Sequence, residues 1–169
     1  MIVGLYEFGQ AIKTGKKAAK RSHYSTRHTQ SVYNQASGTT STYKPGPLPV
    51  LECVLLRKRG RQLQVFSTDL EAWAWGACPT SGEDCAICVR ADVLAKWIDS
   101  LAPSASWKDK REVNLTITPR TCKLLASIKD GGVSIRATFL GIDPDEFPSV
   151  DAAIESGKIQ TVGNSQTVH

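Results

Sequence analysis

The sequence has no uninterrupted apolar run of about 18 residues, the length that a membrane-spanning helix requires. Its N-terminus also lacks the charged, apolar and small-residue regions of a secretory signal. We therefore expect no membrane partner and a cytoplasmic location. With 41% hydrophobic residues in 169, the chain has enough apolar side chains to bury the core of one domain, which excludes a wholly disordered protein.

The cysteines are odd in number and lack the spacing of a disulfide framework. They are Cys53, Cys78, Cys85, Cys88 and Cys122. Cys85 and Cys88 have CxxC spacing, but a zinc site needs four ligands, and the nearest histidine is His28. A redox pair would begin at a helix N-terminus, whereas these two fall in a strand-like run. We expect reduced, packed thiols, with no metal and no cofactor.

Motifs of catalysis are also missing: there is no Gly-rich phosphate loop, nucleophile elbow or His–Glu metal motif. Asp69 and Glu71 could form a carboxylate pair, but no histidine or third carboxylate joins them in sequence. The acidic residues at 143–146 flank a proline, where such side chains satisfy turn donors. The pattern favours a protein that is not an enzyme. An enzyme that uses the cysteines, or Asp69 and Glu71, is the disfavoured alternative.

Positive charge is concentrated at one end of the chain. Residues 1–50 hold seven Lys or Arg against one acidic residue, a net +6, whereas the other 119 residues hold fourteen against fifteen, a net −1. The N-terminal region is therefore the part that would meet a polyanion, of which nucleic acid is the first candidate.

Residues 5–21 are predicted to form a helix, with Leu5, Phe8 and Ile12 at apolar spacing. Its basic residues recur at helical intervals along one side. They are Lys13, Lys16, Lys17, Lys20 and Arg21. Residues 22–46 are polar, without apolar periodicity, and are predicted to be a long surface loop inserted before a proline-rich stretch.

Short strand-like runs follow at residues 50–57, 62–67, 70–76 and 85–89, and a second helix is predicted over 91–101. Three more strands are expected at 113–118, 122–128 and 133–139, with Asp130-Gly131-Gly132 as a turn. A helix followed by about three strands thus occurs twice, which predicts an α+β fold. Trp73, Trp75 and Trp97 are expected in the core rather than as base-stacking groups, and Trp107 is open to either role.

Four motifs from residue 48 to 150 together resemble the N-terminal domain of the bacterial DNA sliding clamp, the beta subunit of DNA polymerase III. They are Leu-Pro-Val-Leu at 48–51, the strand ending in Thr-Asp-Leu-Glu at 68–71, the helix up to the proline at 103, and Asp-Glu-Phe-Pro-Ser-Val at 145–150. They occur in the family's order and span more than half of the chain. The first strand of the family is reduced to residues 1–4 or absent, and the insertion at 22–46 is a departure.

This resemblance implies a DNA-clamp fold over residues 1–150, with two helix-plus-strand repeats and helices on one face of antiparallel sheets. Residues 151–169 would be a tail or the start of a second domain. The implied function is that of a polymerase processivity factor, which encircles duplex DNA without catalysis and closes a ring with itself or other clamp domains. The implied DNA-binding residues are Lys13, Lys16, Lys17, Lys20, Arg21, Lys44 and Lys96. The strand at 133–139, including Ile135, is the candidate ring interface.

The resemblance covers one of the three domains that a clamp chain contains. Polymerase and clamp loader are therefore expected partners only if a longer parent chain exists. The alternative reading is a stand-alone clamp-like module that binds nucleic acid or regulates without forming a ring.

Overall fold

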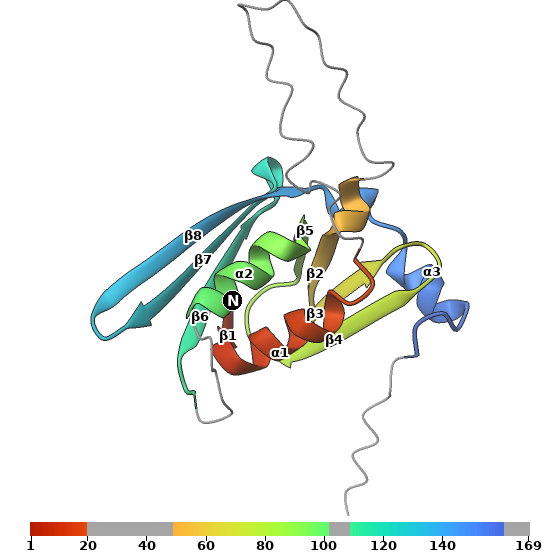
Figure 1. The fold of residues 1–169 in the computed structure, drawn as a ribbon. Coiled ribbons are helices and arrows are strands. Elements are labelled where there is room, and N and C mark those ends of the chain that lie inside the picture. Colours follow the sequence, from red (N-terminus) through yellow and green to blue (C-terminus); the bar gives the residue numbers. More distant parts are fainter. Residues whose placement is uncertain (20–48, 102–108, 161–169) are drawn as a thin grey trace, which may run out of the picture.

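The computed structural model describes residues 1–19, 49–101 and 109–160, which form two consecutive strand–helix–three-strand repeats (Figure 1). The first repeat contains β1 (Ile2–Gly4), α1 (Leu5–Gly15), β2 (Cys53–Arg59), β3 (Gln62–Thr68) and β4 (Trp73–Pro79). The second contains β5 (Cys85–Arg90), α2 (Ala91–Leu101), β6 (Glu112–Thr118), β7 (Lys123–Asp130) and β8 (Val133–Ile142). Short helices η2 (Pro49–Glu52), η3 (Pro119–Thr121), η4 (Pro144–Glu146) and α3 (Val150–Glu155) connect or follow them. The predicted α+β fold class is confirmed.

The strands form one antiparallel sheet in the order β1-β6-β7-β8-β5-β2-β3-β4. The first strand of each repeat pairs with the other repeat, because β1 lies beside β6 and β5 lies beside β2. This exchange ties the two repeats into one unit. The halves meet where β8 pairs with β5 at Gly141 and Ile142. A Cβ atom at Gly141 would lie 2.5 Å from the carbonyl oxygen of Cys88, so this close contact requires glycine.

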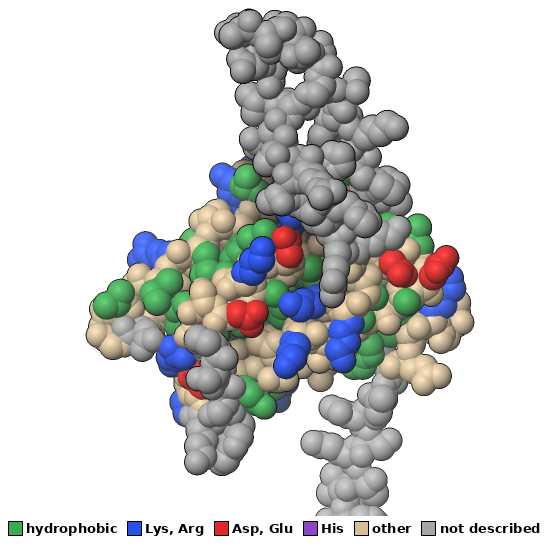
Figure 2. Space-filling model, in the orientation of Figure 1, with side chains coloured by type: hydrophobic (Ala, Val, Ile, Leu, Met, Phe, Trp, Pro, Cys, Tyr) green, Lys and Arg blue, Asp and Glu red, His purple; other side chains and the backbone are tan. Residues whose placement is uncertain are grey.

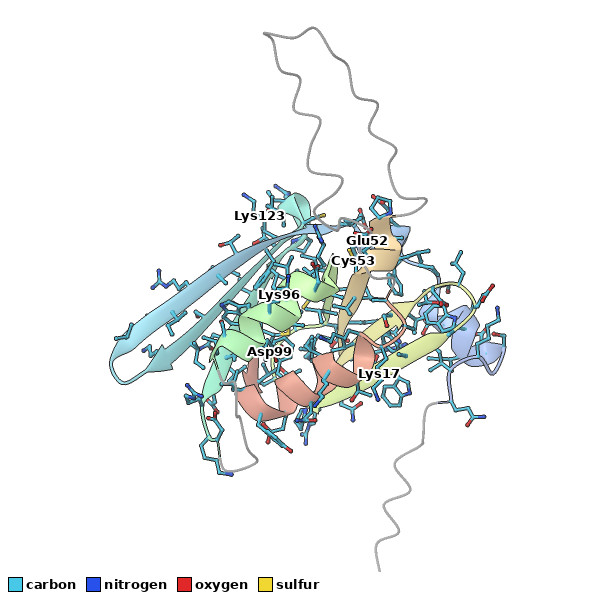
Figure 3. The ribbon with its side chains drawn as sticks, viewed as in Figure 1. Lys17, Glu52, Cys53, Lys96, Asp99 and Lys123 are labelled. Carbon is cyan, nitrogen blue, oxygen red and sulfur yellow. The ribbon has the colours of Figure 1, made fainter. Side chains whose placement is uncertain are left out.

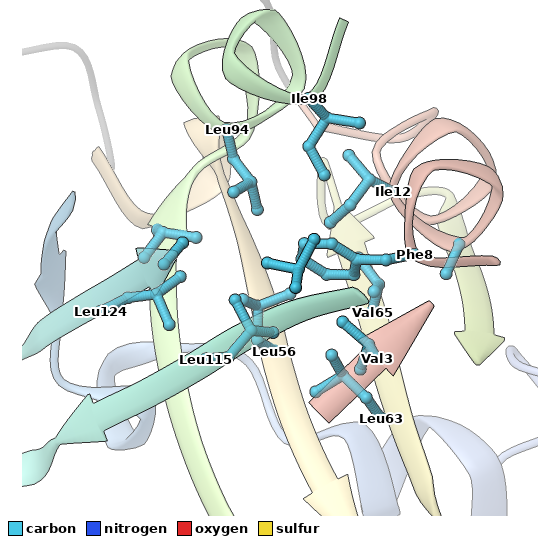
Figure 4. Close-up of a cluster of buried hydrophobic side chains, with 14 of the residues drawn as sticks. Val3, Phe8, Ile12, Leu56, Leu63, Val65, Leu94, Ile98, Leu115 and Leu124 are labelled. Atoms are coloured by element: carbon cyan, nitrogen blue, oxygen red, sulfur yellow. The ribbon is translucent and has the colours of Figure 1, made fainter. Parts of the chain in front are cut away.

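The main core lies between the sheet and the layer of α1 and α2 (Figure 4). Phe8 and Ile12 of α1 meet Leu94 and Ile98 of α2 above the inward-facing side chains of the strands. Phe8 is fully buried, and burial of one such side chain stabilises the fold by about 1.5–3 kcal/mol. The predicted arrangement, with both helices on one face of the sheet, is confirmed.

A second core cluster lies on the opposite face of the sheet, over β2, β3, β4 and β5. There Phe66 and Cys88 contact Phe147, Val150 and Ala153, which come from the segment after β8. The helix α3 in this segment begins at Ser149, whose hydroxyl accepts a hydrogen bond from the backbone amide of Ala152 at 3.2 Å. The packed part of the chain therefore continues past residue 150 and includes Ile159.

The first helix is shorter than predicted. It ends at Gly15, not at residue 21, and Lys16 is its C-cap. A Cβ atom at Gly15 would lie 2.6 Å from the carbonyl oxygen of Val65, so α1 presses against β3 at its last residue. The hydroxyl of Ser67 then binds the carbonyl of Gly15 and the amide of Ala18. These contacts end the helix although the sequence after Gly15 favours its continuation.

Two strands, β2 and β4, begin three residues later than predicted. Residues 50–52 belong to η2, and residues 70–72 form a turn before β4. Asp69 fixes this turn by accepting hydrogen bonds from the amides of Glu71 and Ala72, at 3.1 and 2.7 Å. The predicted glycine turns are confirmed, with positive φ at Gly60, Gly131 and Gly132. None of the helices in the described ranges is long and apolar enough to cross a membrane.

Candidate nucleic-acid interface

Four of the seven predicted DNA-binding residues lie in the described part of the chain, and all four belong to the helix layer. Lys13 is in the last turn of α1, Lys16 caps it, Lys17 follows in the next turn, and Lys96 is on α2. Figure 3 shows Lys17 and Lys96 on this layer. Lys13, Lys17 and Lys96 are exposed and Lys16 is half-buried. Lys20, Arg21 and Lys44 lie outside the described residues.

The lysines do not form the continuous helical ridge that the spacing predicted, because α1 ends at Gly15. They are held instead by the turn that closes the helix. The amide of Lys16 donates to the carbonyl of Ile12 at 3.0 Å, and the amide of Lys17 donates to that of Thr14 at 3.3 Å. Two lysines therefore project from a fixed turn at the end of α1.

The charge on this layer is mixed. Within the described residues, none of the four lysines forms an ion pair. Acidic side chains lie among them, as Figure 2 shows over α1 and α2. Glu7 and Asp99 are exposed on the helices, whereas Asp92 is paired with Arg90 at 3.1 Å. Such a surface can attract phosphates through screened contacts, but its cations are not dense enough to bind them tightly.

Lys13 and Lys16 also have a structural role that requires no nucleic acid. Cations in the last turn of a helix are stabilised by the partial negative charge of its C-terminal carbonyl groups. This interaction accounts for part of the local enrichment in lysine. It does not account for Lys96, which lies in the middle of α2.

The described sheet has open strand edges at β4 and along most of β8, as well as at β1, the strand at its other end. β4 is the last strand of the sheet and pairs with β3 alone. β8 pairs with β7 from Val133 to Leu140, and its other edge meets β5 at residues 141 and 142. Ile135, the predicted interface residue, is 37% exposed on this free part of β8, opposite buried Ile128. An open edge of this kind can pair with a strand of another chain.

The cysteines are free thiols, of which Cys53, Cys78 and Cys88 are buried and Cys85 and Cys122 are half-buried. Cys85 and Cys88 lie on β5 three residues apart, so their side chains point to opposite faces of the sheet and cannot act as a redox pair. Burial, followed by the charge of Glu52, raises the pKa of Cys53 to about 11, and burial raises that of Cys78 to about 12. In the described ranges, no three or more His, Cys, Asp or Glu residues are grouped to hold a metal ion.

The tryptophans that the structure describes belong to the core, as predicted. Trp73 packs edge-on against Phe147 with ring centroids 6.1 Å apart. Trp75 stacks on Phe66 at 6.4 Å, and Trp97 contacts Phe139 at 5.7 Å. All three rings are half-buried and pack against the two core clusters. Trp107 lies outside the described residues.

A second basic surface was missed by the sequence reasoning. Lys123, Lys129 and Arg136 are exposed on the β7–β8 hairpin, and all three point away from the helices. Their signal is a period of two residues: the core positions Leu124 and Ile128 on β7 and Phe139 on β8 have the opposite parity along their strands.

No protein-family model matches the sequence, and no curated protein is similar to it in sequence. Solved structures are similar in fold. The DNA polymerase III subunit beta from Pseudomonas aeruginosa matches with a TM-score of 0.60 and 19% identity, covering 89% of this chain and 31% of that one. The DNA polymerase sliding clamp from Caulobacter crescentus matches with a TM-score of 0.62 and 13% identity, covering 96% and 33%. The griselimycin-bound clamp from Bartonella birtlesii matches with a TM-score of 0.58 and 16% identity, covering 88% and 31%.

The chain therefore has the fold of part of a beta sliding clamp and spans about a third of the length of the clamps that it matches. Identities this low establish the fold alone.

Proposed function

We propose that this chain is a sliding-clamp-like domain that contacts duplex DNA without sequence preference and supports the processivity of a DNA polymerase. The observation that carries the proposal is the clamp fold with lysines on the helix layer. The proposal includes no catalytic step. A domain that slides must attract the phosphate backbone and leave the base edges unread, and exposed, unpaired lysines do this.

Ring closure would use the open edges of β4 and β8. If β8 of one domain paired with β4 of the next, the sheets would continue across the contact and neither edge would be left open. Val133 and Ile135, exposed to 63% and 37%, would then lie at the interface. This contact is heterologous, so its repetition can close a ring of clamp domains, whether from copies of this chain or from others.

The test is solution mass against concentration, by light scattering, with and without a nicked duplex DNA circle. A working clamp forms a closed multimer that stays on the circle during gel filtration and is released when a restriction enzyme linearises the DNA. Retention that is the same before and after linearisation contradicts encirclement, because a ring slides off an end.

A substitution at the proposed interface sharpens the test. Ile135→Glu places a charge at the free edge of β8 and is expected to shift assembly to higher concentration. Leu125→Glu is the matched control, since Leu125 is also an exposed aliphatic strand residue, at 40%, but lies on β7, which pairs with β6 on one side and β8 on the other. Equal assembly of the two variants contradicts the proposed edge.

The alternative is a clamp-like module that binds nucleic acid or regulates without forming a ring. A monomer at every concentration, with weak and salt-sensitive binding to linear and circular DNA alike, would favour it.

A further inference from the structure

The outer face of the sheet, opposite α1 and α2, is covered by packed residues on one half of the sheet and not on the other. The outer face of β2, β3, β4 and β5 is covered by residues 143–159, which contribute Phe147, Val150, Ala153 and Ile159 to the second core cluster. In Figure 1, α3 lies beside this half, and the β7–β8 hairpin extends away from it. The core clusters contain no outward-facing residue of β1, β6 or β7 in the described structure.

The uncovered half carries a diagonal apolar stripe. Leu125 of β7 lies opposite Thr138 of β8, and Leu140 lies opposite Lys123, so the two leucines are diagonal neighbours on one face. Ile2 of β1 lies on the same face, opposite Asn114 of β6. The three apolar side chains are exposed to 40%, 74% and 44%, respectively. We call Ile2, Leu125 and Leu140 the outer stripe.

Cations flank the outer stripe on both sides. Lys123 lies beside Leu140, and Lys129 and Arg136 lie toward the tip of the hairpin. All three are exposed, and none forms an ion pair within the described residues. Glu112 is the sole acidic residue among the outward-facing positions that the structure describes on β1, β6, β7 and β8. This face is therefore positive and partly apolar.

The covered half shows what kind of segment fits such a face. Its covering segment is acidic, with apolar anchors: Asp143, Asp145, Glu146, Asp151 and Glu155 alternate with the residues of the second cluster. Asp151 pairs with Arg57 at 3.0 Å and with Arg59 at 3.5 Å. Arg57 in turn lies over the ring of Phe66, 5.1 Å from its centroid. On this half of the sheet, an acidic segment with apolar anchors thus pairs with the arginines and buries the apolar side chains. The other half is built mainly from the second copy of the same repeat.

We propose that the outer stripe and its flanking cations dock an acidic segment of a partner protein, with aliphatic or aromatic side chains as anchors. Carboxylates of the partner would meet Lys123, Lys129 and Arg136, and its apolar side chains would cover Leu125 and Leu140. The exposed leucines favour a protein segment over single-stranded nucleic acid, because the positive charge alone would attract either. The described outward positions of these four strands hold no aromatic ring on which bases could stack.

The experiment uses the full chain, labelled with nitrogen-15, and a synthetic peptide with the sequence of residues 143–156 as the acidic, apolar probe. Titration of the peptide is expected to shift the amide signals of β6, β7 and β8. The double variants Leu125→Ser with Leu140→Ser, and Lys123→Glu with Arg136→Glu, are each expected to weaken binding at least about tenfold. The controls are Val93→Ser and Lys96→Glu, which remove an exposed apolar residue and an exposed cation from α2 and should leave the peptide affinity unchanged.

Three results would overturn the proposal. One is the absence of any shift up to about 1 mM peptide, which is the weakest affinity of use to a docking site. Another is a set of shifts confined to β2, β3 and β4, which would mean that the peptide displaces the chain's own segment. The last is binding of DNA at the same site. A 20-nucleotide duplex or single strand, about two helical turns, would shift the same amide signals, displace the peptide and bind more weakly to the same variants. A failure of ring formation would leave all of these readouts unaffected.

Discussion

The hydroxyl of Ser67 donates a hydrogen bond to the carbonyl oxygen of Gly15, the last residue of α1. The hydroxyl oxygen of Ser67 in turn accepts a hydrogen bond from the backbone amide of Ala18 at 3.1 Å. Ser67 is fully buried on β3, so one side chain both ends the first helix and fixes the turn that carries Lys16 and Lys17.

Replacement of Ser67 by alanine should therefore destabilise the protein. It leaves the buried carbonyl of Gly15 and the amide of Ala18 without this partner, which costs about 1–3 kcal/mol in the free energy of unfolding. Urea denaturation measures the loss. Ser134→Ala, at an exposed position of β8, is the control and should change the midpoint little. Equal stability of the two variants would show that water replaces the hydroxyl.

Lys58 and Asp84 should make stability depend on acid pH. The ammonium group of Lys58 is buried and donates to the carbonyl oxygens of Gly60 and Gly82 and, at 3.2 Å, to the carboxylate of Asp84. The hydrogen bond from Lys58 holds the pKa of Asp84 below its usual value. A lowered pKa in the folded state gives stability that is full above the unfolded pKa of about 3.9 and is lost as the pH falls through the folded pKa.

Asp84→Asn is therefore expected to lower the urea midpoint at neutral pH and to approach the parent protein at strongly acid pH. Asp99→Asn, an exposed carboxyl on α2, is the control. The range from pH 7 to pH 2 spans the carboxyl titration. If the urea midpoints of the parent and Asp84→Asn differed by a constant amount over this range, the ion pair would be excluded as the cause of the difference.

Much of the fold follows from local patterns. The helix Ala91–Leu101 has the predicted bounds, because its apolar residues recur at helical spacing and a proline follows at position 103. The hairpin turns were predictable because Gly60, Gly131 and Gly132 supply positive φ. By contrast, the end of α1 depends on Ser67, which is 52 residues away from Gly15 in sequence. Local propensity cannot report such a contact.

The pairing of the repeats was also beyond sequence patterns. The pairs β1–β6 and β5–β2 join segments that are far apart in the chain, and no local signal selects them. The helix α3 has six residues, too few for an apolar period, and it forms because Val150 and Ala153 are buried by the sheet. Among the site residues, the lysines were predicted by charge, whereas Arg136 and its neighbours were missed because they lie on a face that only the strand register defines.

The cysteines should differ strongly in reactivity. Cys53, Cys78 and Cys88 are buried, and burial raises the pKa of each thiol, so little thiolate exists at neutral pH. Iodoacetamide at pH 8 is expected to modify the half-exposed Cys85 and Cys122 first, although burial also raises the pKa of Cys85. Peptide mass spectrometry assigns the sites, and a sample in urea, in which all five thiols react, is the control. Rapid native labelling of Cys88 would contradict the packing of the second cluster.

The salt dependence of DNA binding can locate the contact surface. Each phosphate contact by a lysine contributes about 0.9 to the slope of log affinity against log salt for duplex DNA. If Lys17 and Lys96 both touch phosphates, the double variant Lys17→Gln with Lys96→Gln should reduce that slope by up to about 1.8 and weaken binding to all sequences equally. Fluorescence anisotropy of a labelled duplex at several salt concentrations measures both effects. The double variant Lys123→Gln with Lys129→Gln removes the same two charges from the opposite face of the sheet and should leave the slope unchanged. If this outer-face variant lost as much affinity and slope as the helix variant, net charge would be the cause of the attraction. The helix layer would then not be the DNA-facing surface.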